Sequence, residues 1–365
     1  MFGQWTHQTS RHSSREPGAV YGSLTSILPR RGARPELPSQ VEDRPDTFAR
    51  YPTVAVVICA HSEDRWDDLV AAVASVKQQT YRPAEIVLVI DHNPVLQHRS
   101  AHELPGVKVV PNDNEQGLQG ARNAAVAAAT SEIVAFVDDA VAERNWLAAL
   151  AAPYADPRVL GVGGQVIPVW QTGRPNWFPP EFDWVVGCSY RGMPTKPQVR
   201  NFNGALMSLR RGLLVQSGGF DAGLSCENTE ICARLQRRHL DGVYLYEPKA
   251  VVRRHVPCSR STWSYYRSRC YAEGLSKAVV RGLAGPEWIM SSEKSYLRSI
   301  IPGAIVRNLG KALRGQPDGV AGAMALAVGV LTTGIGYAVG RIRLPRNTES
   351  THVRWPTMTE LGAVG

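Results

Sequence analysis

Residues 133–140, IVAFVDDA, join an apolar run to two adjacent carboxylates, Asp138 and Asp139. Such a run is typical of a strand buried in a sheet, where an uncompensated charge is costly. We therefore expect both aspartates at the exposed carboxyl end of the strand, the edge at which open α/β sheets bind their ligands. Paired carboxylates there suit a hard divalent cation, whose usual partner is a diphosphate. An acidic turn that caps the next helix is the alternative.

The sequence before this stretch alternates between strand and helix patterns. Residues 53–59 (TVAVVIC) and 85–91 (EIVLVID) are apolar runs typical of buried parallel strands, and residues 107–110 predict a third, short strand. Residues 66–79 place apolar side chains at helical spacing, and residues 117–129 are rich in alanine. Strands and helices in alternation predict an α/β fold built on a doubly wound, mostly parallel sheet.

Composition divides the rest of the chain. Residues 1–50 are rich in Arg, Pro, Ser and Gly and lack an apolar period, so we expect a disordered arm. Its five acidic residues argue against an organelle-targeting peptide. Residues 51–260 carry the alternating pattern and form the expected α/β domain. Residues 261–343 predict a helical, basic extension, and residues 344–365 predict a tail.

The net charge of +9 is concentrated in the C-terminal third. From Lys249 onward there are 17 Lys and Arg against 6 Asp and Glu, whereas the preceding residues hold 24 against 26. Such a region suits nucleic acid or an anionic membrane surface. The chain has no zinc-finger, RNA-binding or helix-turn-helix pattern, so we expect no nucleic-acid partner.

The cysteines point to a reducing compartment. The six cysteines include no CxxC pair, and no apolar signal segment precedes them. Reduced thiols and a cytoplasmic location are therefore expected.

Residues 319–340 form an uncharged segment of 22 residues inside the basic extension. A helix of this length reaches about 33 Å, enough to cross a hydrocarbon core. Six of its residues are glycine, and Lys311, Arg314, Arg341 and Arg343 flank it. This composition favours a segment that lies in or dips into the inner leaflet over one that spans the membrane. A soluble helix pair packed on the α/β domain is the alternative.

Six motifs occur in an order that resembles family 2 glycosyltransferases of the GT-A fold, over residues 53–280. They are VVICAHSED (56–64), SVKQQTYRPAEIVLVIDHN (75–93), GLQGARNAAV (117–126), FVDDA (136–140) with Trp146-Leu147, NFNGALMSLRR with SGGFDAGL (201–224), and CENTEICARL (226–235). The resemblance implies an inverting hexosyltransferase that moves a sugar from a UDP- or GDP-sugar donor to a lipid-linked or glycan acceptor. It also implies synthesis of a glycolipid or envelope polysaccharide at the inner face of a bacterial-type cell membrane.

The resemblance assigns the nucleotide site to strand ends. Asp91 would accept a hydrogen bond from the nucleotide base, and Cys59, His61 and Glu63 would line the base and ribose. Arg122 would face the base or the diphosphate from the alanine-rich helix. Without the resemblance, Asp91 reads as a helix cap and Arg122 as a solvated helix charge.

The metal turn departs from the family pattern. That pattern has aspartates at its first and third positions, and here the third position is Ala140. The resemblance assigns Asp139 as the metal ligand, with Asp138 supporting it or touching the ribose. His255 resembles the histidine that some GT-A enzymes bring to the metal or diphosphate, although a structural histidine is the alternative. Mg²⁺ or Mn²⁺ would neutralise the leaving nucleoside diphosphate.

The catalytic base is expected where the family has a Glu-Asp pair, which here reads Glu227-Asn228. An amide cannot take a proton, so Glu227 is the predicted base. Glu230 is expected to interact favourably with the helix dipole, because it lies in the first turn of the helix. Ala140 and Asn228 also allow a non-catalytic relative that binds the nucleotide sugar. A nucleotidyltransferase is a further alternative, although residues 60–63 (AHSE) are not its glycine-rich phosphate loop.

Overall fold

The computed structural model describes residues 51–138, 140–193, 198–200, 202, 206–221, 227–284 and 295–343. For residues 227, 283 and 284 it describes the backbone alone. The predicted N-terminal arm, the predicted tail and the predicted metal ligand Asp139 lie outside the described residues. All described residues belong to the unit Asp46–Gly365.

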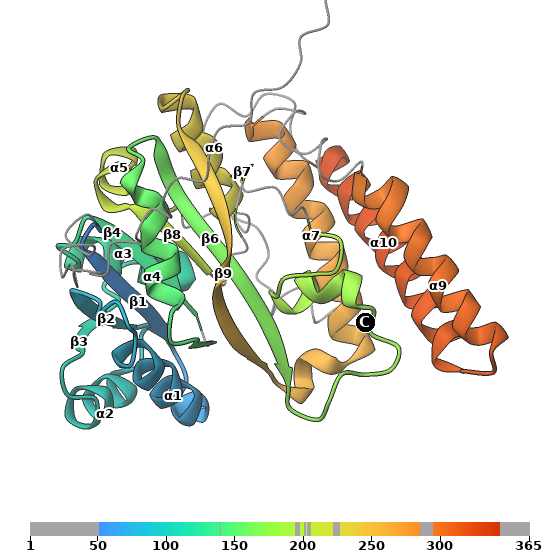
Figure 1. Cartoon of the computed structure of the whole chain (residues 1–365), viewed down its shortest axis with the longest axis horizontal. Coiled ribbons are helices and arrows are strands. Elements are labelled where there is room, and N and C mark those ends of the chain that lie inside the picture. The colour runs from blue at the N-terminus through green and yellow to red at the C-terminus, as the bar shows by residue number, and fades with distance from the viewer. Residues whose placement is uncertain are drawn as a thin grey trace, which may run out of the picture. The chain divides into compact units, whose positions relative to one another are not determined.

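The first half of this unit has the predicted alternation of strands and helices (Figure 1). Its strands pair in parallel in the order β3-β2-β1-β4. The strands are β1 (Val54–Ala60), β2 (Glu85–Ile90), β3 (Lys108–Pro111) and β4 (Ile133–Val137). The connecting helices are η2 (Glu63–Arg65), α1 (Trp66–Lys77), α2 (Pro94–Glu103) and α3 (Leu118–Ala128).

The second half extends the same sheet with both antiparallel and parallel neighbours. The full order is β3-β2-β1-β4-β8-β6-β9-β5, with β7 paired to β9. The added strands are β5 (Ala140–Ala142), β6 (Val159–Trp170), β7 (Gln198–Val199), β8 (Leu206–Arg210) and β9 (Val243–Val256). The helices are α4 (Trp146–Ala151), η3 (Ala152–Ala155), η4 (Pro180–Val186), α5 (Arg211–Ser217), α6 (Glu227–Arg238) and η5 (Cys258–Ser261). The α/β class is confirmed, and the sheet becomes mixed beyond β4.

Two hydrophobic cores explain why the first strands are apolar without interruption. Val54, Val56 and Ile58 of β1 pack into one core with α1 and α4, while Ala55 and Val57 pack into the other with α3. Successive side chains of a strand point to opposite faces, so a strand covered on both faces needs an apolar residue at every position. This burial fixes the register that brings the carboxyl ends of β1, β2 and β4 to one edge.

The C-terminal extension is helical, as predicted. It consists of α7 (Trp263–Ala284), η6 (Tyr296–Ile300), α9 (Ile301–Leu313) and α10 (Asp318–Arg343). Figure 1 shows α9 and α10 next to each other beside α7, and α10 contacts both helices. The apolar segment 319–340 is therefore packed on the protein along one side.

Glycines form the contact between α7 and α10. A Cβ on Gly274 would lie 2.1 Å from the carbonyl oxygen of Thr333, and one on Gly336 would lie 2.2 Å from that of Tyr271. Only glycine, whose side chain is a hydrogen atom, permits the two backbones to come this close. Small residues allow the same close approach at other helix–helix contacts. Two of the glycines that lower the hydrophobicity of segment 319–340, Gly336 and Gly340, thus serve this contact.

We expect Gly274→Ala to destabilise the protein by about 1–3 kcal/mol, because the new methyl group forces the two helices apart. Gly282→Ala is the matched control in the same helix, since a Cβ there meets nothing within 4 Å. That control should be neutral or stabilising, given the higher helix propensity of alanine. Urea unfolding measures both variants. A Gly274→Ala protein as stable as the control would contradict the packing argument.

Candidate functional site

The carboxyl ends of the parallel strands carry most of the predicted nucleotide-site residues. A shallow pocket lies at the end of β1 and is lined by Ile58, Cys59, Ala60, His61, Ser62, Arg65, Leu69 and Ala72. Cys59 is half-buried, whereas His61 and Glu63 are exposed. Asn93 fixes the loop after β1, because its Nδ2 donates to the His61 carbonyl oxygen at 3.2 Å. Cys59 and His61 therefore share one pocket, and Glu63 opens the short helix next to it.

Asp91 organises the end of β2. Its Oδ1 accepts from Nδ2 of Asn112 at 2.6 Å and contacts Nδ1 of His92 at 2.9 Å. Its Oδ2 accepts from the backbone N–H of Gly117 at 2.9 Å. Gly117 has a φ of +128°, a backbone conformation that residues other than glycine rarely adopt. The carboxylate thus joins the ends of β2 and β3 to the start of α3, and its contact with a nucleotide base stays a prediction.

Arg122 lies in the interior of the protein. Its Nη2 donates to Oδ2 of Asp138 at 2.7 Å, and its Nη1 donates to Oδ1 of Asn228 at 3.0 Å. The guanidinium carbon lies 5.4 Å from the ring centre of Phe136 and 5.6 Å from that of Phe220. The alternative of a solvated helix charge is wrong, because the side chain is 0% exposed. Its predicted contact with the base or diphosphate stays a prediction.

This arrangement gives a physical reason for the asparagine at position 228. Removing a guanidinium from water is costly, and the carboxylate of Asp138 compensates its charge. Asn228 supplies a further acceptor without a second negative charge near Asp138. Its side-chain oxygen is therefore engaged in holding Arg122, across 106 residues of sequence.

Helix α6 carries two acids near its start, Glu227 and Glu230, and the structure describes the side chain of Glu230 but not that of Glu227. Glu230 is held by Arg234, whose Nε and Nη2 donate to its two oxygens at 2.8 and 3.0 Å. The same Arg234 donates to the backbone carbonyls of Ser217 and Gly219. Glu230 is thus part of a structural link between α6 and the end of α5. Glu227 is the first residue of α6, and its side chain lies outside the described part of the chain.

The predicted metal turn lies where β4, β5 and β9 meet. Asp138 is buried, and Ala140 pairs with Arg254, so His255 directly follows the pairing partner of the turn. The described residues contain no group of three or more His, Cys, Asp or Glu side chains that could hold a metal, and they do not include Asp139. Carboxylates together with an imidazole would fit Mn²⁺ at this turn. The metal roles of Asp139 and His255 stay predictions.

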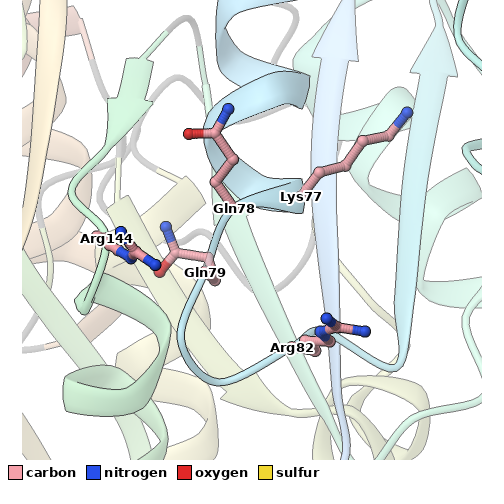
Figure 2. A pocket seen from close by; sticks show the side chains of 5 residues that line it. All are labelled: Lys77, Gln78, Gln79, Arg82 and Arg144. Atoms are coloured by element: carbon pink, nitrogen blue, oxygen red, sulfur yellow. The ribbon is translucent and has the colours of Figure 1, made fainter.

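A second pocket lies at the opposite edge of the sheet, where the parallel strands begin. It is lined by Lys77, Gln78, Gln79, Arg82 and Arg144 (Figure 2). Figure 2 shows the Lys77 and Arg82 side chains extending away from Arg144, so the positive groups do not converge. Gln79 is buried and donates to backbone carbonyls of Ser75 and Glu143. This pocket is separate from the strand-end site.

The sequence analysis did not identify Asn112, although a signal existed. Asn112 directly follows β3, as Asp91 follows β2, and the edge formed by neighbouring parallel strands could have placed the two together. Asp68 was also missed. Its contact with His255 joins residues 187 positions apart, and no local pattern predicts it.

Comparison with known proteins agrees with the α/β fold. The family "Glycosyl transferase family 2" matches residues 55–217. Glucosyl-dolichyl phosphate glucuronosyltransferase of Haloferax volcanii is 30% identical over 315 residues, 82% of this chain and 99% of that protein. Pre-mycofactocin glycosyltransferase of Mycobacterium tuberculosis is 26% identical over 205 residues, 55% of this chain and 41% of that protein.

A solved structure supports the architecture. The mannosyltransferase from Pyrobaculum calidifontis, in complex with GDP-Man and Mn²⁺, matches with a TM-score of 0.51 at 19% identity, over 80% of this chain and 88% of that one. This likeness confirms the GT-A fold. The fold and the matched sequence define a nucleotide-sugar-dependent transferase. The chain belongs to glycosyltransferase family 2, and this membership favours an enzyme over the non-catalytic and nucleotidyltransferase alternatives.

We expect Arg122→Met to lower the free energy of unfolding by about 3–5 kcal/mol, because Asp138 then stays buried without its guanidinium partner. Arg253→Met is the control. Arg253 pairs with Glu143 at 2.8 Å, with side chains 52% and 43% exposed, and such pairs contribute about 0–1 kcal/mol. Chemical denaturation followed by circular dichroism measures both. If both variants lost the same free energy of unfolding, the buried ion pair would contribute no more to stability than the exposed one.

Proposed function

We propose that this enzyme transfers a sugar from a UDP- or GDP-sugar to a polyisoprenyl-phosphate-linked acceptor, with inversion and with a divalent cation. The observation that carries the proposal is the match to a glucosyl-dolichyl phosphate glucuronosyltransferase over 99% of that protein's length. With 82% of this chain covered, the match extends well beyond the family 2 domain at residues 55–217. A lipid-linked acceptor would require the enzyme to work at a membrane surface.

The exposed faces of α9 and α10 support membrane association. α10 is the one helix in the described residues that is long and apolar enough to cross a membrane, and a third of its apolar window is buried. Away from α7, both helices expose large apolar side chains. These are Val306, Leu309, Leu313, Val320, Met324, Leu331, Ile335 and Ile342. A helix pair with one side on the protein and the other apolar suits a position in the membrane interface.

Basic side chains accompany this apolar surface. Lys311 and Arg314 lie at the end of α9, and Arg341 and Arg343 lie at the end of α10. Positive charges next to an inserted apolar face are attracted to anionic lipids. We therefore propose that α9 and α10 lie in the interface at the cytoplasmic face of the membrane.

Two contacts attach this helix pair to the catalytic domain. Arg307 of α9 forms an ion pair with Glu181 of η4, a carboxylate that is 1% exposed. The hydroxyl of Tyr296 in η6 donates to the Glu181 carbonyl oxygen at 2.7 Å. These contacts would hold the membrane-binding helices in a fixed relation to the sheet.

The proposed reaction assigns one task to the catalytic base and another to the groups that would hold the cation. An inverting transfer needs a carboxylate to take the proton from the acceptor hydroxyl as the new glycosidic bond forms and the diphosphate leaves. Glu227 is the acid we propose for this task, because Asn228 holds Arg122 and Glu230 holds Arg234. A cation held by Asp139 and His255, with Asp138 in support, would neutralise the leaving diphosphate.

The acceptor class is tested with dolichyl-phosphate-linked glucose and unlinked glucose as acceptors, a panel of UDP- and GDP-sugars, and Mn²⁺. We expect transfer to the lipid-linked acceptor, detected by mass spectrometry. We also expect chelation of the cation to abolish it. Equal transfer to both acceptors would contradict a lipid-linked substrate, and unchanged turnover after chelation would contradict the cation.

The base assignment is tested in the same assay. Glu227→Gln should lower kcat by about 10²-fold or more while leaving nucleotide affinity unchanged, because the amide cannot accept the proton. Glu230→Gln is the control, since it should mainly weaken the contact with Arg234. A larger kcat loss in Glu230→Gln than in Glu227→Gln would reverse the assignment.

The membrane surface is tested by co-sedimentation with anionic vesicles. The double variant Leu331→Glu/Ile335→Glu places charges on the exposed face of α10, so it should stay in the supernatant while the parent sediments. Leu240→Glu is the control, because Leu240 is 86% exposed outside the helix pair. Sedimentation of the double variant at the parent level would place the membrane contact elsewhere.

A further inference from the structure

Asp68, in the first turn of α1, connects that helix to the end of β9. Its Oδ2 lies 3.3 Å from Nδ1 of His255. The same oxygen accepts from Nη2 of Arg65 at 2.9 Å and from its Nε at 3.2 Å. The three side chains are 25% to 35% exposed, so they line a surface edge of the protein.

This cluster lies between the two parts of the strand-end site. Arg65 lines the pocket at the end of β1, together with Cys59 and His61. His255 follows Arg254, the pairing partner of Ala140 at the start of β5. Helix α1 also contacts β5, the strand that follows the metal turn. Asp68 is therefore the side chain that links the β1 pocket to the turn.

The contact determines which ring nitrogen of His255 carries the hydrogen. The carboxylate of Asp68, paired with Arg65, can only accept hydrogen bonds, so Nδ1 of His255 must be the donor in this contact. In the neutral ring, Nε2 then keeps its lone pair. Within the described part of the chain, Nε2 makes no hydrogen bond. A histidine that binds a metal commonly donates its other ring N–H to a carboxylate in this way.

We propose that Asp68 is a positioning residue that holds His255 with Nε2 presented to the divalent cation. The proposal rests on the metal dependence in the proposed function and adds a residue to it. Arg65 restrains the carboxylate, and the carboxylate fixes the tautomer and the orientation of the ring. An imidazole ligand is less hard than a carboxylate, so this arrangement suits Mn²⁺ better than Mg²⁺.

The competing explanation is that Asp68 is only an acid favoured by the helix dipole. Asp67 provides the matched control, because it shares the first turn of α1 and is exposed. Asp67→Ala and Asp68→Ala remove the same charge from the same helix turn. A purely structural role for Asp68 predicts equal effects of the two substitutions on metal affinity.

The test is a titration of the full chain with Mn²⁺ alone, with free Mn²⁺ measured by electron paramagnetic resonance. Asp68→Ala should bind Mn²⁺ about 10-fold more weakly or worse, the usual effect of losing such a partner. Asp67→Ala should bind like the parent. In a His255→Gln background, Asp68→Ala should cause no additional loss, because the ring it positions is gone. Thermal unfolding confirms that each variant is folded.

The outcomes separate this proposal from the proposed function. If the parent binds Mn²⁺ and Asp68→Ala binds equally well, the positioning role is overturned and the metal site stands. An equal loss in Asp67→Ala, or a full additional loss in the His255→Gln background, also overturns it. A parent that binds no Mn²⁺ overturns the metal dependence, and the role of Asp68 with it.

Discussion

The buried ion pair between Arg122 and Asp138 is the constraint on which the strand-end edge of the sheet depends. It ties α3 to the end of β4, and the contact with Asn228 adds the start of α6. A guanidinium without exposed surface requires compensation by fixed partners, and removal of either member of the ion pair leaves an uncompensated interior charge. The turn that follows β4 and the helix that begins with Glu227 are therefore positioned by the same side chain.

Similar links occur along the whole edge. Asp91 joins Asn112 and Gly117, and Asn93 holds the loop after β1. Each link connects segments that follow different strands, so the edge is organised by side chains that restrain one another. Groups held in this way need little rearrangement when a substrate binds, which is the main structural requirement for electrostatic stabilisation.

The first half of the fold could be predicted from the sequence, because its strands are buried on both faces. Their uninterrupted apolar runs predicted β1, β2 and β4, and the acids that follow β2 and β4 marked the ends of those two strands. The second half was harder to predict. β6 and β9 have 12 and 14 residues, and no long strand was predicted at either place, because partly exposed positions interrupt their apolar pattern. Family membership and the α/β fold are confirmed, whereas the roles of the individual site residues stay predictions.

Contacts distant in sequence account for what the sequence analysis missed at the site. Nothing around Arg122 indicates that its partners are Asp138 and Asn228, and an arginine in an alanine-rich helix normally faces water. The asparagine at position 228 looked like the loss of a catalytic acid. In the folded protein it is a neutral acceptor beside a pair whose charges already balance.

The glycine contact between α7 and α10 has a consequence for orientation. Backbones that meet without intervening side chains cannot rotate or slide past one another without a steric clash, so α10 has one rotational setting on α7. The apolar side chains on its other face therefore always point the same way. On a lipid surface, this setting would determine the height of the strand-end site above the headgroups. That height would in turn determine how far an acceptor sugar must protrude from the membrane to reach the site.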